Sequence, residues 1–240
     1  GVVRSAMLAK TVSSEVEAGL DHTVKLLQGL GHQVHDAEPA VDYPALAVAF
    51  LTNWCFGVKK SIDDAKLLLG RECRKSDVEL VNWGLAAAGN VLGDADLAAA
   101  RTTFARTTQA FDSFFKNYDI LLSPVLAKPP LRIGETAPNA FERLLLNALT
   151  AYPKAWALKT LIKTMAAQSF AFAAFTMTFN VTGMPAASVP VYWTESNLPI
   201  GMQIATGVGG DALLLQLAHE LEEAVAWTHR APPLLNAPIK

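Results

Sequence analysis

Charged residues and cysteines are scarce in this sequence of 240 residues. Only 18% of the residues are charged and 51% are hydrophobic, a low charge fraction for a soluble domain. Two explanations fit this balance: an α/β enzyme with a large core, or a fragment whose apolar surface is normally covered by a further segment. The net charge is −2, and the charges of both signs are scattered. We therefore expect neither a nucleic-acid partner nor an anionic membrane.

The spacings of common metal, redox and phosphate motifs are also missing. Cys55 and Cys73 form neither a CxxC pair nor a disulfide framework, so a reducing, cytoplasmic setting is expected. His32 and His35 would point to opposite faces of a strand, and no HExxH pair occurs, which argues against a metal site. Residues 207–211 read Gly-Val-Gly-Gly-Asp and could hold an anion at a helix N-terminus. We favour an ordinary turn there, with Asp211 as the N-cap.

Long apolar runs are absent as well. The most apolar region, residues 155–179, is interrupted by Lys159, Lys163 and Gln168. A membrane-spanning helix needs about 20 predominantly apolar residues in a row, so this region predicts a buried helix instead. The first residues do not show the pattern of a secretory signal peptide. The sequence therefore predicts no membrane partner.

A strand–helix–strand pattern opens the chain. Residues 2–9 read as a strand, and Ser14 with Glu17 predicts a capping box for the helix that follows. Gly29 and Gly31 are expected to end that helix. A second strand over residues 34–38 completes a βαβ unit, whose strands should be parallel with a right-handed crossover.

The remaining sequence alternates helical and strand-like segments. Helices are predicted over residues 45–69 (as one helix or two), 77–91, 94–118 and 141–180, the last one broken or kinked at Pro153. We expect the strands to share one mixed sheet with helices on both faces, which is an α/β fold. The predicted strands are Val2–Ala9, Val34–Glu38, Ile120–Ser123, Ala187–Val191 and Ile200–Ala205.

Two segments near the C-terminus are more specific than the others. Residues 180–190 read Asn-Val-Thr-Gly-Met-Pro-Ala-Ala-Ser-Val-Pro, and residues 198–204 read Leu-Pro-Ile-Gly-Met-Gln-Ile. Gly183 and Pro185 should end a helix, because glycine tolerates positive φ and proline cannot continue a helix. The residues that follow predict a buried strand, a polar turn over residues 194–198 and a second strand.

These two segments resemble the "N-x-T-G-x-P-A-x-S-V-P" and "L-P-x-G-x-Q" passages of the amidase signature family. Further passages match that family in the same order: K-L-L-x-x-L-G-H-x-V at 25–34, Y-D-x-L-L-x-P at 118–124, and E…W-x-x-R-x-P-P-L at 222–234. The resemblance covers nearly the whole chain. Within the family, the sequence is most similar to bacterial amidases of the 6-aminohexanoate cyclic dimer hydrolase type.

This resemblance implies the C-terminal half of the amidase signature fold. Residues 1–240 would be the C-terminal part of a single amidase domain whose catalytic N-terminal half is absent. The family hydrolyses amide bonds with a Ser–Ser–Lys triad and a Gly/Ser-rich tract that precede the matching region, and it needs no metal or organic cofactor. No such tract occurs here, and the family does not use the position of Ser188 catalytically. We therefore expect no catalytic residue in this chain and no activity from the chain alone.

The resemblance also points to residues that border the substrate. In relatives, the segment that corresponds to residues 173–180 borders the acyl-binding cleft, which implicates Ala173, Phe175 and Thr176 in substrate binding. Amidotransferase-type relatives carry an acidic residue near its start, where alanines stand here. An apolar lining favours an uncharged, partly aliphatic or aromatic amide. The alternative is that the aromatic residues of this segment belong only to the core.

Cys55 is the fourth residue assigned to substrate binding, because the family's cleft is partly lined by helices between its two conserved halves. It could line the cleft, act as a nucleophile, or be a buried small hydrophobic residue, which is the usual fate of a free cysteine. Cys73 stands among Arg71, Arg74 and Lys75, whose charges could favour its thiolate. We favour an incidental surface position for Cys73.

Three functions remain open at this point. The leading one is part of an amidase that hydrolyses a carboxylic amide (C–N) bond, with this chain supplying part of the sheet and one wall of the substrate cleft. The second is a non-catalytic subunit or pseudo-amidase that pairs with another chain. The third is a hydrolase that uses Cys55 with a histidine. An uncovered sheet edge would need the missing N-terminal half, a partner chain or self-association as a homo-oligomer.

Overall fold

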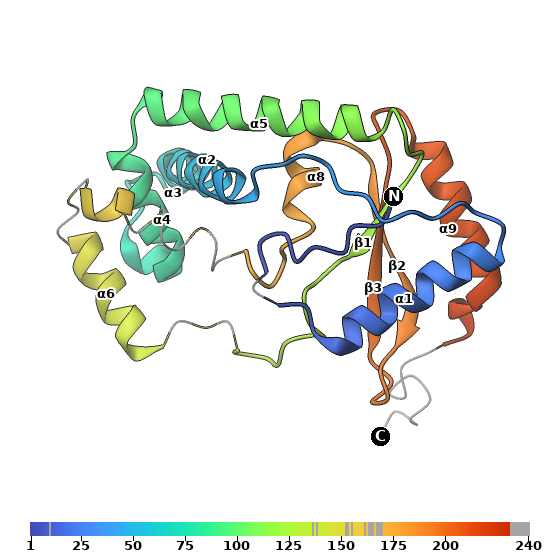
Figure 1. The fold of residues 1–240 in the computed structure, drawn as a ribbon. Helices are drawn as coiled ribbons and strands as arrows, with labels where there is room; N and C mark the ends of the chain where they lie inside the picture. The colour runs from blue at the N-terminus through green and yellow to red at the C-terminus, as the bar shows by residue number, and fades with distance from the viewer. Residues whose placement is uncertain are drawn as a thin grey trace, which may run out of the picture. The chain divides into compact units, whose positions relative to one another are not determined.

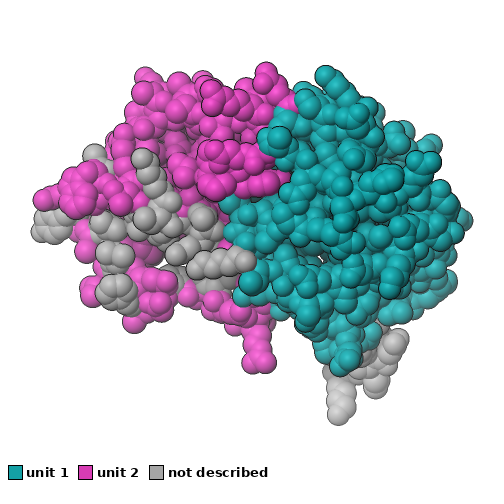
Figure 2. Space-filling model, viewed as in Figure 1, with its two compact units in different colours: residues 1–40, 110–130, 172–240 teal, residues 41–109, 131–171 magenta. Residues whose placement is uncertain are grey.

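The computed structural model describes residues 1–9, 11–135, 137, 139–151, 154, 156–160, 162, 166 and 170–230. The chain forms two compact units, which Figure 2 distinguishes by colour. Unit 1 consists of residues 1–40, 110–130 and 172–240, and unit 2 of residues 41–109 and 131–171. In the part of the chain that is described, no helix is long and apolar enough to cross a membrane.

Unit 1 is built on a three-stranded antiparallel sheet (Figure 1). Its strands are β1 (Leu121–Pro124), β2 (Ala186–Trp193) and β3 (Pro199–Ala205), in the order β1-β3-β2. The turn between β2 and β3 is closed by a hydrogen bond from the Thr194 N–H to the Leu198 carbonyl. Asn197 adopts a φ of 62°, which asparagine tolerates better than most residues. The expected polar turn and its two flanking strands are therefore confirmed.

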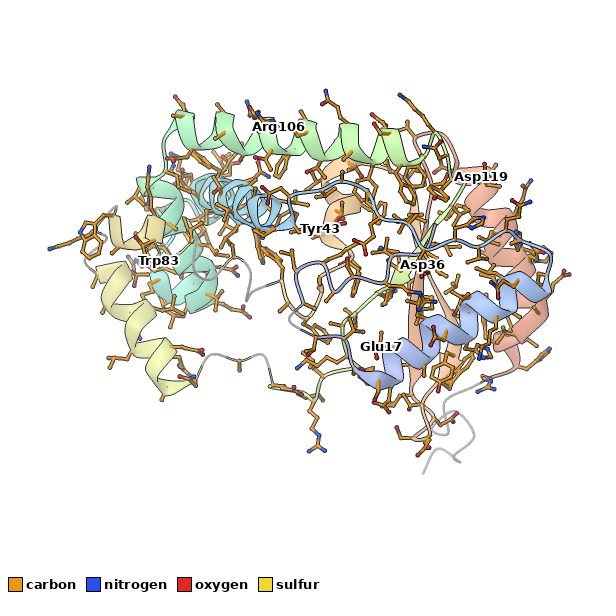
Figure 3. The ribbon with its side chains drawn as sticks, viewed as in Figure 1. Glu17, Asp36, Tyr43, Trp83, Arg106 and Asp119 are labelled. Atoms are coloured by element: carbon orange, nitrogen blue, oxygen red, sulfur yellow. The ribbon has the colours of Figure 1, made fainter. Side chains whose placement is uncertain are left out.

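The predicted βαβ unit at the start of the chain is only partly formed. Val2 forms isolated parallel bridges with Asp36 and with Leu122, so the expected parallel direction is correct. The full strands predicted over residues 2–9 and 34–38 are wrong. The chain turns away from the sheet soon after Val2, because the Ala9 N–H bonds back to the Ala6 carbonyl. Asp36, labelled in Figure 3, also receives a hydrogen bond of 2.7 Å from Arg4 Nε, which ties the second segment to the first.

One face of the sheet is covered by α1 (Ser14–Gly29) and α9 (Asp211–Val225). In both helices the N-cap lies one residue before the predicted one. Ser13, not Ser14, caps α1, with its Oγ accepting from the Val16 N–H at 3.4 Å. Gly210, not Asp211, is the N-cap of α9. Aliphatic residues of both helices and of alternate β3 positions form one core: Val16, Leu20, Leu27, Ile200, Met202, Ile204, Leu214, Leu217 and Leu221.

The opposite face of the sheet carries the segment that leads into α8 (Met177–Thr182). Gly183 ends α8 with a φ of 68°, as its place in the sequence predicts. Residues 170–176 form a series of turns, although they belong to the helical region predicted over residues 141–180. Two of their carbonyls accept hydrogen bonds from outside the segment, and these contacts replace helical ones. Helix α8 lies on the other side of the sheet from α1 and α9 (Figure 1), so the sheet is flanked by helices, which confirms the α/β class.

Unit 2 is helical among its described residues. It contains α2 (Tyr43–Asp64), α3 (Lys66–Leu69), a 3-10 turn (Lys75–Asp77), α4 (Leu80–Val91) and α6 (Ala140–Ala151). Helix α5 (Asp94–Phe114) starts in unit 2 and ends in unit 1. The region predicted as one helix or two over residues 45–69 is thus divided in two. The predicted kink at Pro153 and the end of the last family passage, residues 231–234, lie outside the described residues.

Candidate functional site

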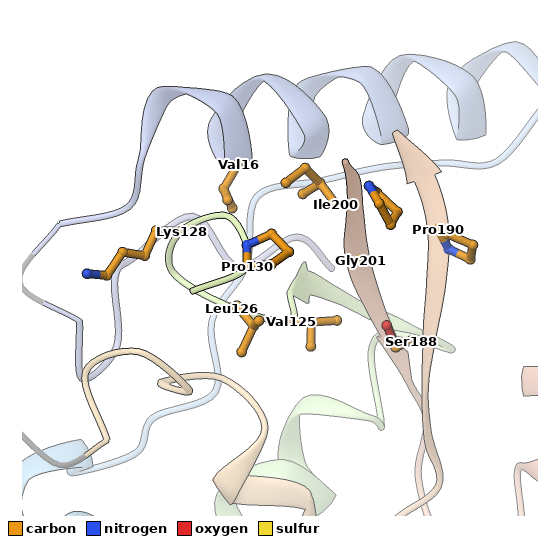
Figure 4. Close-up of a pocket in the computed structure, with 10 residues that line it drawn as sticks. Val16, Val125, Leu126, Lys128, Pro130, Ser188, Pro190, Ile200 and Gly201 are labelled. Carbon is orange, nitrogen blue, oxygen red and sulfur yellow. The ribbon is translucent and has the colours of Figure 1, made fainter. Parts of the chain in front are cut away.

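Unit 1 contains a groove beside strands β2 and β3, with a volume of about 350 Å³ (Figure 4). We call it the β2–β3 groove. Its lining is mainly apolar, and Lys128 contributes the one charged side chain among its lining residues. It includes residues of β2, of β3 and of the loop that follows β1: Val125, Leu126, Lys128, Ser188, Pro190 and Gly201.

Gly201 keeps this groove open. A Cβ atom at this position would lie 2.6 Å from Ser188 Oγ and 3.2 Å from Val125 Cγ2. Ser188 is exposed, and among the described residues its hydroxyl makes no hydrogen bond. A nucleophilic serine needs a base within hydrogen-bond reach, which Ser188 does not have here. The groove can therefore accept an apolar group, but it contains no activated nucleophile.

A buried hydrogen-bonded chain crosses the sheet beside the groove. Gln203 Nε2 donates to Ser123 Oγ at 3.1 Å and to the Phe175 carbonyl at 3.4 Å. Ser123 Oγ in turn donates to the Pro124 carbonyl at 3.1 Å. The sequence motifs predict no role for either side chain. The available signal was a glutamine inside an otherwise apolar predicted strand, which must find partners when buried.

The structure brings three of the predicted substrate-binding residues together in one turn of unit 1. Ala173 and Thr176 are partly exposed, and Thr176 Oγ1 donates to the Ala173 carbonyl at 3.4 Å. Phe175 is fully buried, so its ring belongs to the core of unit 1. Within the described residues, Ala173 and Thr176 are the members of this set that a ligand could reach.

Cys55 belongs to unit 2, on α2, and its side chain is fully buried. Burial raises the pKa of the Cys55 thiol to about 11, because the thiolate loses solvation. A nucleophilic cysteine requires the opposite shift. All five histidines of the sequence fall in unit 1, so neither unit contains a Cys–His pair. These findings favour the structural role for Cys55.

The remaining candidates have ordinary surroundings. His32 is exposed, and its Nε2 lies 3.0 Å from Glu220 Oε2. The described residues contain no cluster of three metal-ligating side chains. Residues 207–210 form a turn closed by a bond from the Gly210 N–H to the Gly207 carbonyl. Cys73 is partly exposed in the connection after α3.

Known proteins of similar sequence identify the family to which this architecture belongs. The amidase family profile matches residues 1–215. The 6-aminohexanoate-cyclic-dimer hydrolase of Pseudomonas sp. (strain NK87) is 30% identical over 212 residues, which cover 88% of this chain and 40% of that enzyme. The lipoamidase of Enterococcus faecalis is 29% identical over 206 residues, which cover 86% of this chain and 28% of that protein.

Solved structures agree with the sequence relatives. A structure of 6-aminohexanoate cyclic dimer hydrolase superposes with a TM-score of 0.80 at 25% identity, covering 98% of this chain and 47% of that one. A bacterial aryl acylamidase of the amidase signature enzymes shares the fold, with a TM-score of 0.69 at 16% identity. The chain thus spans less than half the length of these relatives, and it matches them almost from end to end of its own sequence. The chain belongs to the amidase family.

Proposed function

We propose that this chain is the C-terminal portion of a hydrolase that cleaves a carboxylic amide (C–N) bond. Its part in that enzyme is to supply strands of the sheet and one wall of the substrate cleft. The observation that carries this proposal is the combination of a family match over residues 1–215 with coverage of only 40% of the cyclic dimer hydrolase.

The catalytic groups would come from a preceding portion that contains the Gly/Ser-rich tract and the lysine. In such an enzyme, a serine hydroxyl attacks the amide carbonyl, and the leaving amine takes a proton as the C–N bond breaks. Water then hydrolyses the acyl ester to a carboxylic acid and restores the serine. This chain would supply no catalytic residue, and the scheme needs neither a metal ion nor an organic cofactor.

The proposed substrate is an uncharged amide with an aliphatic or aromatic acyl part. The β2–β3 groove is mainly apolar, and the turn that holds Ala173 and Thr176 carries no charged side chain. We propose that Ala173 and Thr176 contact the substrate, that Phe175 fixes their turn, and that Cys55 contributes to substrate binding through the packing of α2. The relatives named 6-aminohexanoate-cyclic-dimer hydrolase and lipoamidase support an amide as the substrate.

The remaining portion of the enzyme is the proposed partner, either in the same polypeptide or as a separate chain, in a reducing, cytoplasmic setting. Self-association as a homo-oligomer is the alternative to a partner for covering the sheet edge that the missing portion would pair with. The second candidate function is a non-catalytic or pseudo-amidase subunit that pairs with another chain. The length of the relatives favours the hydrolase over the non-catalytic subunit, because this chain covers only 40% of the cyclic dimer hydrolase.

The test is the intact mass of the protein isolated from its source cell, combined with the upstream reading frame. We expect a polypeptide or a tightly associated complex about twice the mass of this chain, with a Gly/Ser-rich, lysine-containing portion. A 25.7 kDa protein with no such partner would contradict the proposal. A partner that lacks the serines and the lysine would favour the pseudo-amidase instead.

A further inference from the structure

Gln203 is a polar side chain buried inside the sheet of unit 1, with 4% of its surface exposed. Its neighbours on β3, Met202 and Ile204, point into the core formed with α1 and α9. Because side chains alternate along a strand, Gln203 points to the opposite face, where the turn of residues 172–176 lies. A glutamine in this place must form hydrogen bonds, since an unpaired buried amide is unfavourable.

The turn of residues 172–176 depends on hydrogen bonds from outside itself. Buried backbone that is neither helix nor strand needs external partners for its carbonyl groups. The Phe172 carbonyl accepts from the Ala127 N–H at 3.0 Å, and the Phe175 carbonyl accepts from Gln203 Nε2. The first bond holds the start of the turn to the loop after β1, and the second holds its end to β3.

Ser123 fixes the orientation of the glutamine. Its hydroxyl donates to the Pro124 carbonyl, which leaves an Oγ lone pair to accept from Gln203 Nε2. Ser123 and Gln203 are direct partners in the β1–β3 register, so the distance between them is set by the sheet. The two N–H groups of one amide thus join β1, β3 and the turn. Glutamate and methionine have similar lengths but cannot donate both bonds.

We propose that Gln203 is a positioning residue that holds the turn of residues 172–176, and through it Ala173 and Thr176, in place for substrate binding. This inference rests on the proposed function in its last step only. The anchoring of the turn follows from the hydrogen bonds themselves, and it is testable without any measurement of activity.

The first arm of the test is hydrogen exchange on the complete protein as it occurs in its source cell. In Gln203→Met, the amides of residues 172–177 should exchange roughly tenfold faster than in wild type, because one buried carbonyl loses its donor. Gln28→Met is the matched control, since Gln28 is exposed on α1. Leu217→Ala provides a second control that lowers global stability from the other face of the sheet.

The second arm measures kinetics with an uncharged amide substrate. Gln203→Met should raise KM by roughly five- to tenfold with a smaller change in kcat, whereas Leu217→Ala should lower the melting temperature and leave KM unchanged. If Gln203→Met does not fold, Ser123→Ala replaces it, with a local acceleration of exchange of roughly two- to fivefold.

The inference is overturned if the amides of residues 172–177 exchange no faster in Gln203→Met than in Leu217→Ala, once any difference in melting temperature between the two variants is taken into account. An unchanged KM alongside accelerated exchange would overturn the link to substrate binding. A wild-type protein that hydrolyses no amide would instead contradict the proposed function, and the exchange arm would still decide whether Gln203 anchors the turn.

Discussion

Gly201 on β3 lies so close to Ser188 on β2 that a Cβ atom on the glycine would come within 2.6 Å of the serine Oγ. The glycine of the L-P-x-G-x-Q passage is thus explained by the serine of the other passage, and the two belong to neighbouring strands. Their contact forms part of the floor of the β2–β3 groove.

Gly201→Ala should therefore destabilise the protein by about 1–3 kcal/mol, although alanine is normally the better strand residue by about 0.5–1 kcal/mol. The double variant Gly201→Ala with Ser188→Ala removes the Oγ and should recover at least part of that loss. Urea denaturation of the three proteins measures the effect. Equal stability of Gly201→Ala and wild type would show that the serine moves aside freely.

A second close approach occurs in unit 2, where Gly89 on α4 meets α2. A Cβ atom on Gly89 would lie 2.5 Å from the Cys55 carbonyl oxygen and 2.9 Å from Lys59 Cβ. Backbone atoms cannot rotate away, so Gly89→Ala should cost about 1–3 kcal/mol of stability. Gly57 is the matched control, because a Cβ atom there meets nothing within 4 Å. Gly57→Ala should stabilise α2 by about 0.5–1 kcal/mol. A loss of stability in both variants, or in neither, would contradict this account of the α2–α4 contact.

The features that the sequence predicts well are those set by neighbouring residues. Gly183 ends a helix because glycine accepts the positive φ that a left-handed cap needs. The turn at residues 194–198 and its flanking strands follow from the same local chemistry. The predicted caps at Ser14 and Asp211 are each wrong by one residue, because adjacent residues at a helix start compete as caps.

The features that the sequence predicts poorly depend on distant contacts. Residues 170–176 have a helical composition, yet hydrogen bonds to Ala127 and Gln203 hold them in turns. The strand expected over residues 2–9 is limited to bridges at Val2, because the chain turns back at residues 6–9. The hydrogen-bond partners of Gln203 could not be predicted, since they lie 28 and 80 residues away in sequence.

The thiol of Cys55 should be unreactive in the folded protein. Burial raises its pKa to about 11, so the thiolate fraction at pH 8 is on the order of one in a thousand. We expect alkylation of Cys55 by iodoacetamide, in a Cys73→Ser background, to be at least about a hundredfold slower than alkylation of an unfolded peptide. Mass spectrometry of the labelled protein measures the rate, and denaturation provides the positive control. Rapid labelling of Cys55 that abolishes hydrolysis would support the alternative in which Cys55 is the nucleophile.

Arg71 and Asp77 form an ion pair that should be lost when the Asp77 carboxyl is protonated at acid pH. Hydrogen bonds from the Arg71 guanidinium and from the Arg74 N–H lower the pKa of the Asp77 carboxyl to about 2. A carboxyl with a lowered pKa stabilises the folded state fully above its ordinary range near pH 4. Its contribution is lost as the pH falls toward 2. Carbon-detected NMR titration should give a midpoint near 2 in wild type and a higher one in Arg71→Gln. Identical midpoints would show that the pair is absent in solution.

If this chain is one portion of an amidase and supplies none of its catalytic groups, hydrolysis requires the other portion. The most direct measurement compares hydrolysis of an uncharged amide by the 240-residue chain alone and by the same chain joined to, or mixed with, the Gly/Ser-rich and lysine-containing portion. We predict no turnover and no serine-reactive probe adduct with the chain alone, and turnover with both portions. Turnover by the chain alone that survives rigorous purification would contradict the claim.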